Sequence, residues 1–165
     1  MSSVLSQCIS FPLGIIAESS GTSNESNVIQ ENVLKIKDDL QQSFTGQGLQ
    51  ILLKELDKVF SECSVAKWDG YYAVPISSDA YEETIRFLKS LSPFIPPPEI
   101  VPEPDGELAL EWSLSTNRFF IVGFKGDGIV TYSGLFATQK VYGKEHFIET
   151  LPQVITENIC RLLYE

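Results

Sequence analysis

Basic residues are scarce in this 165-residue chain. It has 12 Lys and Arg against 22 Asp and Glu, which gives a formal net charge of −10 at pH 7. An acidic surface repels phosphates, and the chain lacks the basic stretches interleaved with aromatics that single-strand binding proteins use. The composition therefore argues against direct nucleic-acid binding and suits a protein partner with a basic surface. Acidity that serves solubility alone stays open as an alternative.

Histidine and cysteine, which often build metal and nucleophile sites, are also few. The single histidine, His146, has no nucleophile-elbow serine to activate, and it cannot anchor a zinc site with scattered cysteines. The cysteines are Cys8, Cys63 and Cys160. Their odd number and wide spacing argue against a disulfide framework and favour a reducing compartment, so we expect a cytoplasmic protein. We expect no catalytic residue, metal or cofactor, and Cys63 and Cys160 buried on apolar helix faces.

Long hydrophobic runs are missing as well. The apolar stretch at residues 9–17 is too short to span a bilayer, and no Lys or Arg precedes it as in a secretory signal. Its alternation predicts a strand added to a sheet edge, with a mobile tail as the alternative. The polar run that follows, residues 18–27, predicts a flexible loop. We therefore expect an N-terminal segment and loop at residues 1–27, a single domain at residues 28–165, and no association with a membrane.

The chain does contain a series of apolar periodicities, and these predict an α+β fold. Helical spacing covers residues 49–63, 79–92 and 150–163, with a weaker pattern at 28–42. Capping boxes at Asp79 and Thr150 predict where the later helices begin, and the three prolines at 96–98 predict an extended connector. Alternation with a period of two predicts strands at 107–114, 119–124, 129–135 and 139–142. We expect an antiparallel β-meander of about four strands packed against amphipathic helices.

Two segments, residues 68–77 and 102–112, have the most individual sequence of the chain. Each contains an Asp-Gly pair, which we interpret as turn chemistry rather than as catalytic acids. Tyr71 and Tyr72 suit either an interface or the seam between a helix and the sheet, whereas Trp112 suits the core. Glu107 and Glu111 share one strand face, which we expect to be solvated. The predicted partner-binding residues are Trp68, Asp69, Tyr71, Tyr72, Glu103, Asp105, Glu107 and Glu111.

These two segments also support a resemblance. The first has the pattern Trp-Asp-Gly-Tyr-x-Ala-x-Pro, and the second has Pro-Asp-Gly before a strand that ends in Leu-Glu-Trp. Together they resemble a widespread set of small, uncharacterised bacterial proteins, over about residues 68–132 and with Tyr72 in the place of an expected Gly. The resemblance implies a bacterial or phage origin and a link to mobile-element and defence neighbourhoods. It implies no activity and no catalytic residues.

We therefore expect a non-catalytic, acidic protein-binding module. Its role would be that of an antitoxin-like or immunity partner, or of an inhibitor or accessory subunit of a defence system. The alternative is a small metal-dependent hydrolase that uses Asp69, Asp105, Glu107 or Glu111. A homo-oligomer, joined through the 9–17 strand or through a sheet edge, also stays open.

Overall fold

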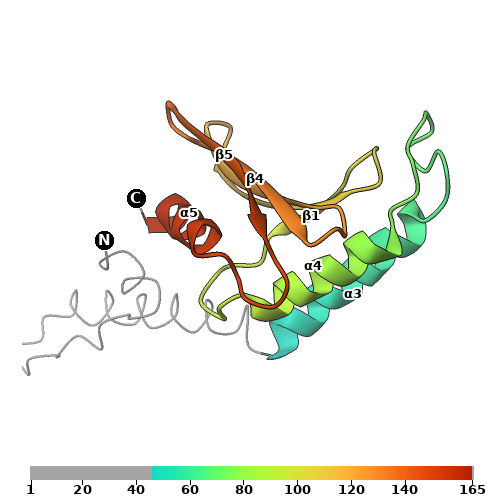
Figure 1. Cartoon of the computed structure of the whole chain (residues 1–165), viewed down its shortest axis with the longest axis horizontal. Coiled ribbons are helices and arrows are strands. Elements are labelled where there is room, and N and C mark those ends of the chain that lie inside the picture. The colour runs from blue at the N-terminus through green and yellow to red at the C-terminus, as the bar shows by residue number, and fades with distance from the viewer. Residues whose placement is uncertain (1–45, 165) are drawn as a thin grey trace, which may run out of the picture.

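The computed structural model describes residues 46–164, coloured in Figure 1. Two helices, α3 (Gly46–Cys63) and α4 (Ser78–Ser90), come first. Five strands and a closing helix follow them: β1 (Glu99–Pro102), β2 (Leu108–Ser115), β3 (Arg118–Phe124), β4 (Ile129–Phe136), β5 (Gln139–His146) and α5 (Gln153–Tyr164). The strand expected at residues 9–17, the loop at 18–27 and the helix at 28–42 lie outside the described residues.

The strands form one antiparallel sheet in the order β1-β2-β3-β4-β5, so each strand pairs with its neighbour in sequence. The predicted α+β class and the meander are confirmed. The sheet has one more strand than expected, because β1 follows directly after the prolines at 96–98, where no strand was predicted. Proline is tolerated at the ends of an edge strand, and Pro102 is the last residue of β1, opposite Leu108.

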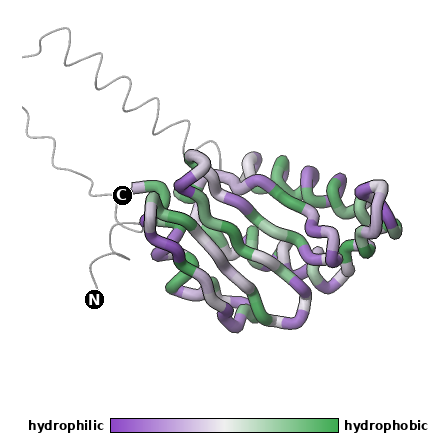
Figure 2. The backbone as a smooth tube through the Cα atoms, turned by 90° about the horizontal axis from the view of Figure 1, so that it is seen from above, coloured by the Kyte–Doolittle hydropathy of each residue, from purple (hydrophilic) through white to green (hydrophobic). Residues whose placement is uncertain are grey.

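The described helices cover one face of the sheet and build a single core with it. Figure 1 shows α3 and α4 side by side, with α5 apart from them at the left, and α5 contacts β2 and β3. The sheet contributes inward residues in register, among them Leu110 opposite Val122 and Trp112 opposite Phe120. Trp112 is a core residue, as predicted, and its indole N–H donates to Pro96 O at 2.9 Å. Figure 2 shows hydrophobic and hydrophilic residues following one another along the strands, as a sheet with one covered face requires.

Two helix starts differ from the predicted ones. The N-cap of α4 is Ser77, whose Oγ accepts a hydrogen bond from Ala80 N at 3.0 Å, so the box predicted at Asp79 does not cap this helix. The closing helix begins at Gln153 rather than near Thr150, and Pro152 O accepts from Ile155 N at 3.1 Å. Both shifts are at most a few residues long.

Among residues 46–164, no helix combines the length and the apolar character that crossing a membrane requires. Cys63 and Cys160 are both buried, as expected. Cys63 is free, and burial raises the pKa of its thiol, with a smaller contribution from Glu62. Cys160, however, is disulfide-bonded, so the expectation of unpaired cysteines is wrong for this residue.

Candidate functional site

The two individual segments of the sequence lie against each other. Val74 N donates a hydrogen bond to Pro104 O at 2.8 Å, and Ser77 N donates to Gly106 O at 3.3 Å. A Cβ atom on Gly106, whose φ is +90°, would stand 3.0 Å from Pro75 O, so only glycine allows this approach. We call residues 64–77, 103–107 and 125–128 the turn cluster, because these three connections meet at one end of the sheet.

The first connection is a loop whose backbone is fixed by its own side chains. Asp69 Oδ1 accepts from Tyr71 N at 2.8 Å and from Ala73 N at 3.2 Å, and Trp68 Nε1 donates to Val74 O at 3.0 Å. These bonds use Asp69 as a turn acceptor and hold Trp68 against the core. The loop is therefore ordered before any partner arrives.

Tyr71 and Tyr72 project from this fixed loop into solvent. Their exposed fractions are 75% and 89%, and Val74 beside them is 52% exposed. The sequence allowed two positions for these tyrosines, an interface or the seam between a helix and the sheet. Their exposure excludes the seam. Two neighbouring aromatic rings in water on a rigid loop form a surface that a partner can cover with little loss of conformational entropy.

The second connection, between β1 and β2, is a tight turn rich in acids. Gly106 N donates to Glu103 O at 3.1 Å, Glu103 N donates to Glu107 O at 2.9 Å, and Asp105 Oδ1 accepts from Glu107 N at 3.3 Å. Asp105 therefore stabilises the turn and keeps its other oxygen in solvent. The Asp-Gly pairs of both segments serve as turns, as the sequence predicted.

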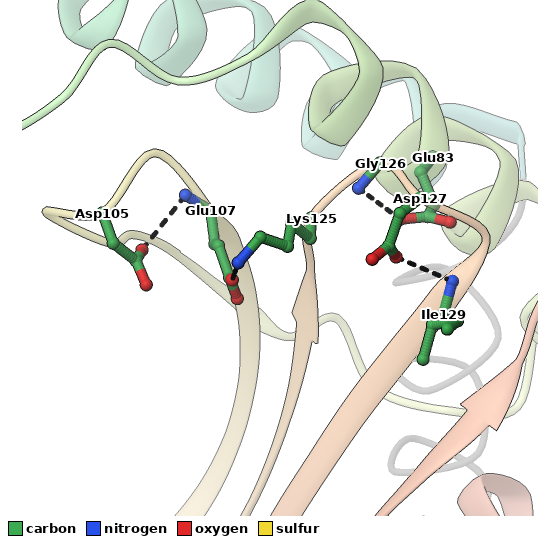
Figure 3. A network of polar contacts seen from close by, with 7 residues as sticks. All are labelled: Glu83, Asp105, Glu107, Lys125, Gly126, Asp127 and Ile129. Atoms are coloured by element: carbon green, nitrogen blue, oxygen red, sulfur yellow. Dashed lines mark hydrogen bonds and ion pairs between the residues drawn. The ribbon is translucent and has the colours of Figure 1, made fainter.

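Glu107 joins this turn to the next one. Its Oε1 accepts from Lys125 Nζ at 2.8 Å, which is the single ion pair among residues 46–164 (Figure 3). The hydrogen bond to Glu107, followed by its charge, raises the pKa of Lys125, and Asp105 and Asp127 add to the effect. The lysine side chain is 65% exposed, so the pair lies at the surface and contributes little to stability.

The third connection is held by Glu83, a residue that sequence reasoning missed. Its side chain is fully buried in α4, and one carboxylate oxygen accepts from Gly126 N at 2.8 Å (Figure 3). The other oxygen accepts from Gly128 N at 3.0 Å. A Cβ atom on Gly126 would lie 2.5 Å from Ala80 N, so the turn packs directly on α4. Asp127 Oδ1 completes the turn by accepting from Ile129 N at 3.0 Å.

Glu111 does not belong to the turn cluster, unlike the other predicted residues. It lies within β2, opposite Glu99 on β1 and Ile121 on β3, on the sheet face that faces away from the helices. Glu107 and Glu111 do share that face, as predicted, but it is only partly solvated. The Glu107 side chain is 21% exposed, and Ala109 between them is buried.

No three His, Cys, Asp or Glu side chains within the described range come together in a way that could hold a metal ion. A hollow of about 350 Å³ lies at the opposite end of the sheet, and Arg118, Phe136 and Arg161 are among its lining residues. Its arginines brace α5: Arg118 Nη2 donates to Leu162 O at 2.8 Å, and the Arg161 guanidinium lies 4.6 Å from the centre of the Phe136 ring.

No protein-family model matches the chain, no curated protein matches its sequence, and no solved structure matches its fold. The resemblance to small bacterial proteins therefore stays a prediction.

Proposed function

We propose that this chain is a non-catalytic protein-binding module whose turn cluster binds a partner with a basic surface. The observation that carries the proposal is the pair Tyr71 and Tyr72, 75% and 89% exposed on a loop that Asp69 and the 103–107 turn hold in place. Tyrosines are enriched among the residues that dominate binding energies, and a rigid loop loses little entropy when it is covered.

Charge supports the choice of a basic partner. Glu103, Asp105 and Asp127 lie at the same end of the sheet as the tyrosine loop, and only one carboxylate of the described residues, that of Glu107, has a lysine partner. Acids without an ion-pair partner attract a cationic surface at long range and speed its association. An antitoxin-like or immunity role, or that of an inhibitor or accessory subunit in a bacterial or phage defence system, is the form of this proposal that the resemblance favours.

Two earlier expectations have less support. Nothing in residues 46–164 favours the metal-dependent hydrolase, because Asp69, Asp105 and Glu107 are used in turns and in an ion pair. A cytoplasmic location stays a prediction. Unpaired cysteines would favour a reducing compartment, but Cys160 is disulfide-bonded.

The test is an affinity purification from the source cells with three baits: the wild-type chain, Tyr71→Ser/Tyr72→Ser, and Leu114→Ser. Leu114 is the matched control, because it is a large exposed apolar side chain, 55% exposed, at the other end of β2. We expect a basic protein to be retained by wild type and by Leu114→Ser and lost with the tyrosine variant. With the purified partner, calorimetry should show a dissociation constant at least tenfold higher for that variant, equal to about 1.4 kcal/mol.

Added salt should also weaken binding, mainly through a slower association rate. Equal retention of every partner by the tyrosine variant would contradict the proposal. So would a partner whose affinity does not depend on salt, because the acidic residues would then have no role.

A further inference from the structure

The described helices leave one face of the sheet uncovered, and we call it the open face. The centre of this face is apolar. Strand alternation places Val101, Phe119, Ile121 and Leu135 there, on the opposite side from the buried Leu110, Phe120 and Val122. All four are only half-buried, and none belongs to the core cluster. Tyr142 extends this apolar area onto β5, where it is 83% exposed.

The two margins of the open face carry opposite charges. Glu99 on β1 and Glu111 on β2 are direct cross-strand partners on one margin. Lys140 and Lys144, both exposed, flank Tyr142 on β5 at the other margin. Along residues 46–164 none of these four residues forms an ion pair, since the single pair joins Lys125 to Glu107.

The acidic margin is unfavourable in the isolated chain. Like charges directly opposite each other on neighbouring strands destabilise a sheet. A pair such as Glu99 and Glu111 is stabilised when positive charge is brought against it from outside. The same face presents such charge on β5, at the opposite edge of the sheet.

Symmetry decides how the two margins can meet. A twofold axis parallel to the strands, lying between two sheets packed face to face, places the β1 margin of one copy over the β5 margin of the other. Glu99 and Glu111 are in register with Tyr142 across the sheet. Glu99 of one copy then lies over Tyr142 of the other, between its two flanking lysines, and Glu111 lies one strand further in. This contact forms twice, once on each side of the shared apolar centre. An axis across the strands would place glutamates on glutamates. We propose that the open face binds a second copy of this chain, with the axis parallel to the strands.

The size of the face sets the area that a dimer can bury. Five strands about 4.8 Å apart and about seven residues long cover roughly 24 Å by 23 Å, or about 550 Å² per copy. Two copies then bury about 1,100 Å², which is near the lower limit for a specific interface. The dimer should therefore form and dissociate over the micromolar range of protein concentration. This surface is separate from Tyr71 and Tyr72, so the inference stands independently of the proposed function.

The test is sedimentation equilibrium of the full chain over a range of concentrations, with charge-reversal variants. Glu99→Lys/Glu111→Lys and Lys140→Glu/Lys144→Glu should each raise the dimer dissociation constant at least tenfold, because each creates two like-charged contacts. Mixing these two variants should restore a heterodimer. Combining all four substitutions in one chain should restore the homodimer, because the margins are then exchanged and remain complementary. Lys54→Glu/Lys58→Glu, the same charge change on exposed positions of α3, is the control and should leave the constant unchanged.

Several outcomes would overturn the proposal. One is a wild-type chain that stays monomeric at the highest concentrations, and another is a four-fold variant that does not recover. Association that ignores Glu99 and Glu111 would indicate pairing through the free edge of β5 instead. If a reversal variant fails to fold, Tyr142→Ser replaces it, since this exposed side chain leaves the core intact and its loss should still weaken the dimer.

Discussion

Glu83 shows how one residue can hold two elements together. A carboxylate without a hydrogen-bond partner is rarely buried, because desolvation is costly. Glu83 is buried because the turn between β3 and β4 offers it two backbone N–H groups, one for each oxygen. The stability of the turn cluster thus depends on a side chain that no partner touches.

We expect Glu83→Gln to lower the free energy of unfolding by about 2–3 kcal/mol, because the amide replaces one acceptor by a donor and leaves a buried backbone N–H unpaired. Urea denaturation at neutral pH measures the change. Glu82→Gln is the control on the same helix, exposed to solvent, and should shift stability by less than about 0.5 kcal/mol. Similar values for the two variants would show that the Glu83 contacts do not stabilise the turn.

The contact between α3 and α4 combines an aromatic stack with a polar bond. The rings of Phe60 and Tyr81 stack with centroids 4.4 Å apart, and Tyr81 Oη donates to Asp57 Oδ1 at 2.5 Å. This hydrogen bond, with burial and the charge of Asp57 as smaller causes, raises the pKa of Tyr81 above its ordinary value near 10. The neutral phenol is therefore the form that joins the two helices.

The raised pKa gives this contact a defined pH dependence. Its stabilisation is fully present below the pKa of an unfolded tyrosine, about 10, and is lost as pH rises through the higher folded value. We expect Tyr81→Phe to be less stable than wild type by about 0.5–1 kcal/mol at pH 8, and the difference to shrink above pH 10. Urea denaturation at several pH values measures both. Tyr72→Phe, at an 89% exposed position, should match wild type throughout, and a gap for Tyr81→Phe that grows with pH would contradict the assignment.

Most helices and strands could be predicted because each buries one face and repeats its apolar residues at a fixed period. β1 was missed, since prolines at 98 and 102 hide a strand that pairs along one edge only. The start of α4 was misplaced because Asp79 and Glu82 have the spacing of a cap that Ser77 in fact provides. Local spacing predicts an element well and its first residue poorly.

The candidate site could be predicted only in part, for a similar physical reason. The turn roles of Asp69 and Asp105 follow from local residue chemistry, which a sequence displays. The contact between Val74 and Pro104 uses backbone atoms that every residue has, so no residue type signals it. Glu83 does have a signal in the sequence: it stands at an inward position of α4, three residues after Ala80 and four before Phe87.

For the molecule as a whole, the net charge of −10 sets the electrostatic balance. Repulsion among like charges destabilises a compact state, and 0.1 M salt screens the repulsion between exposed charges that are more than about 10 Å apart. Salt also screens attractive pairs, but the described residues contain only one ion pair, and its lysine is largely exposed. Salt therefore weakens little attraction in this part of the chain.

We therefore expect added NaCl to raise the melting temperature at pH 7.5 by about 2–4 °C, equivalent to about 1 kcal/mol. Dilute protein keeps self-association out of the measurement, and differential scanning fluorimetry suffices. The rise should shrink near pH 5, close to the isoelectric point, where the repulsion is weaker. A melting temperature that falls with salt at pH 7.5 would mean that attractive pairs dominate instead.

The order of the strands bears on how the chain folds. Each strand pairs with the one that precedes it, so the sheet can grow hairpin by hairpin with short loops to close. The contact of α5 with β3 is different, because the bond from Arg118 to Leu162 closes a separation of 44 residues. Distant contacts are the slow ones to establish. The meander can therefore form before α5 packs against its covered face, and the native core is complete only after that helix has packed.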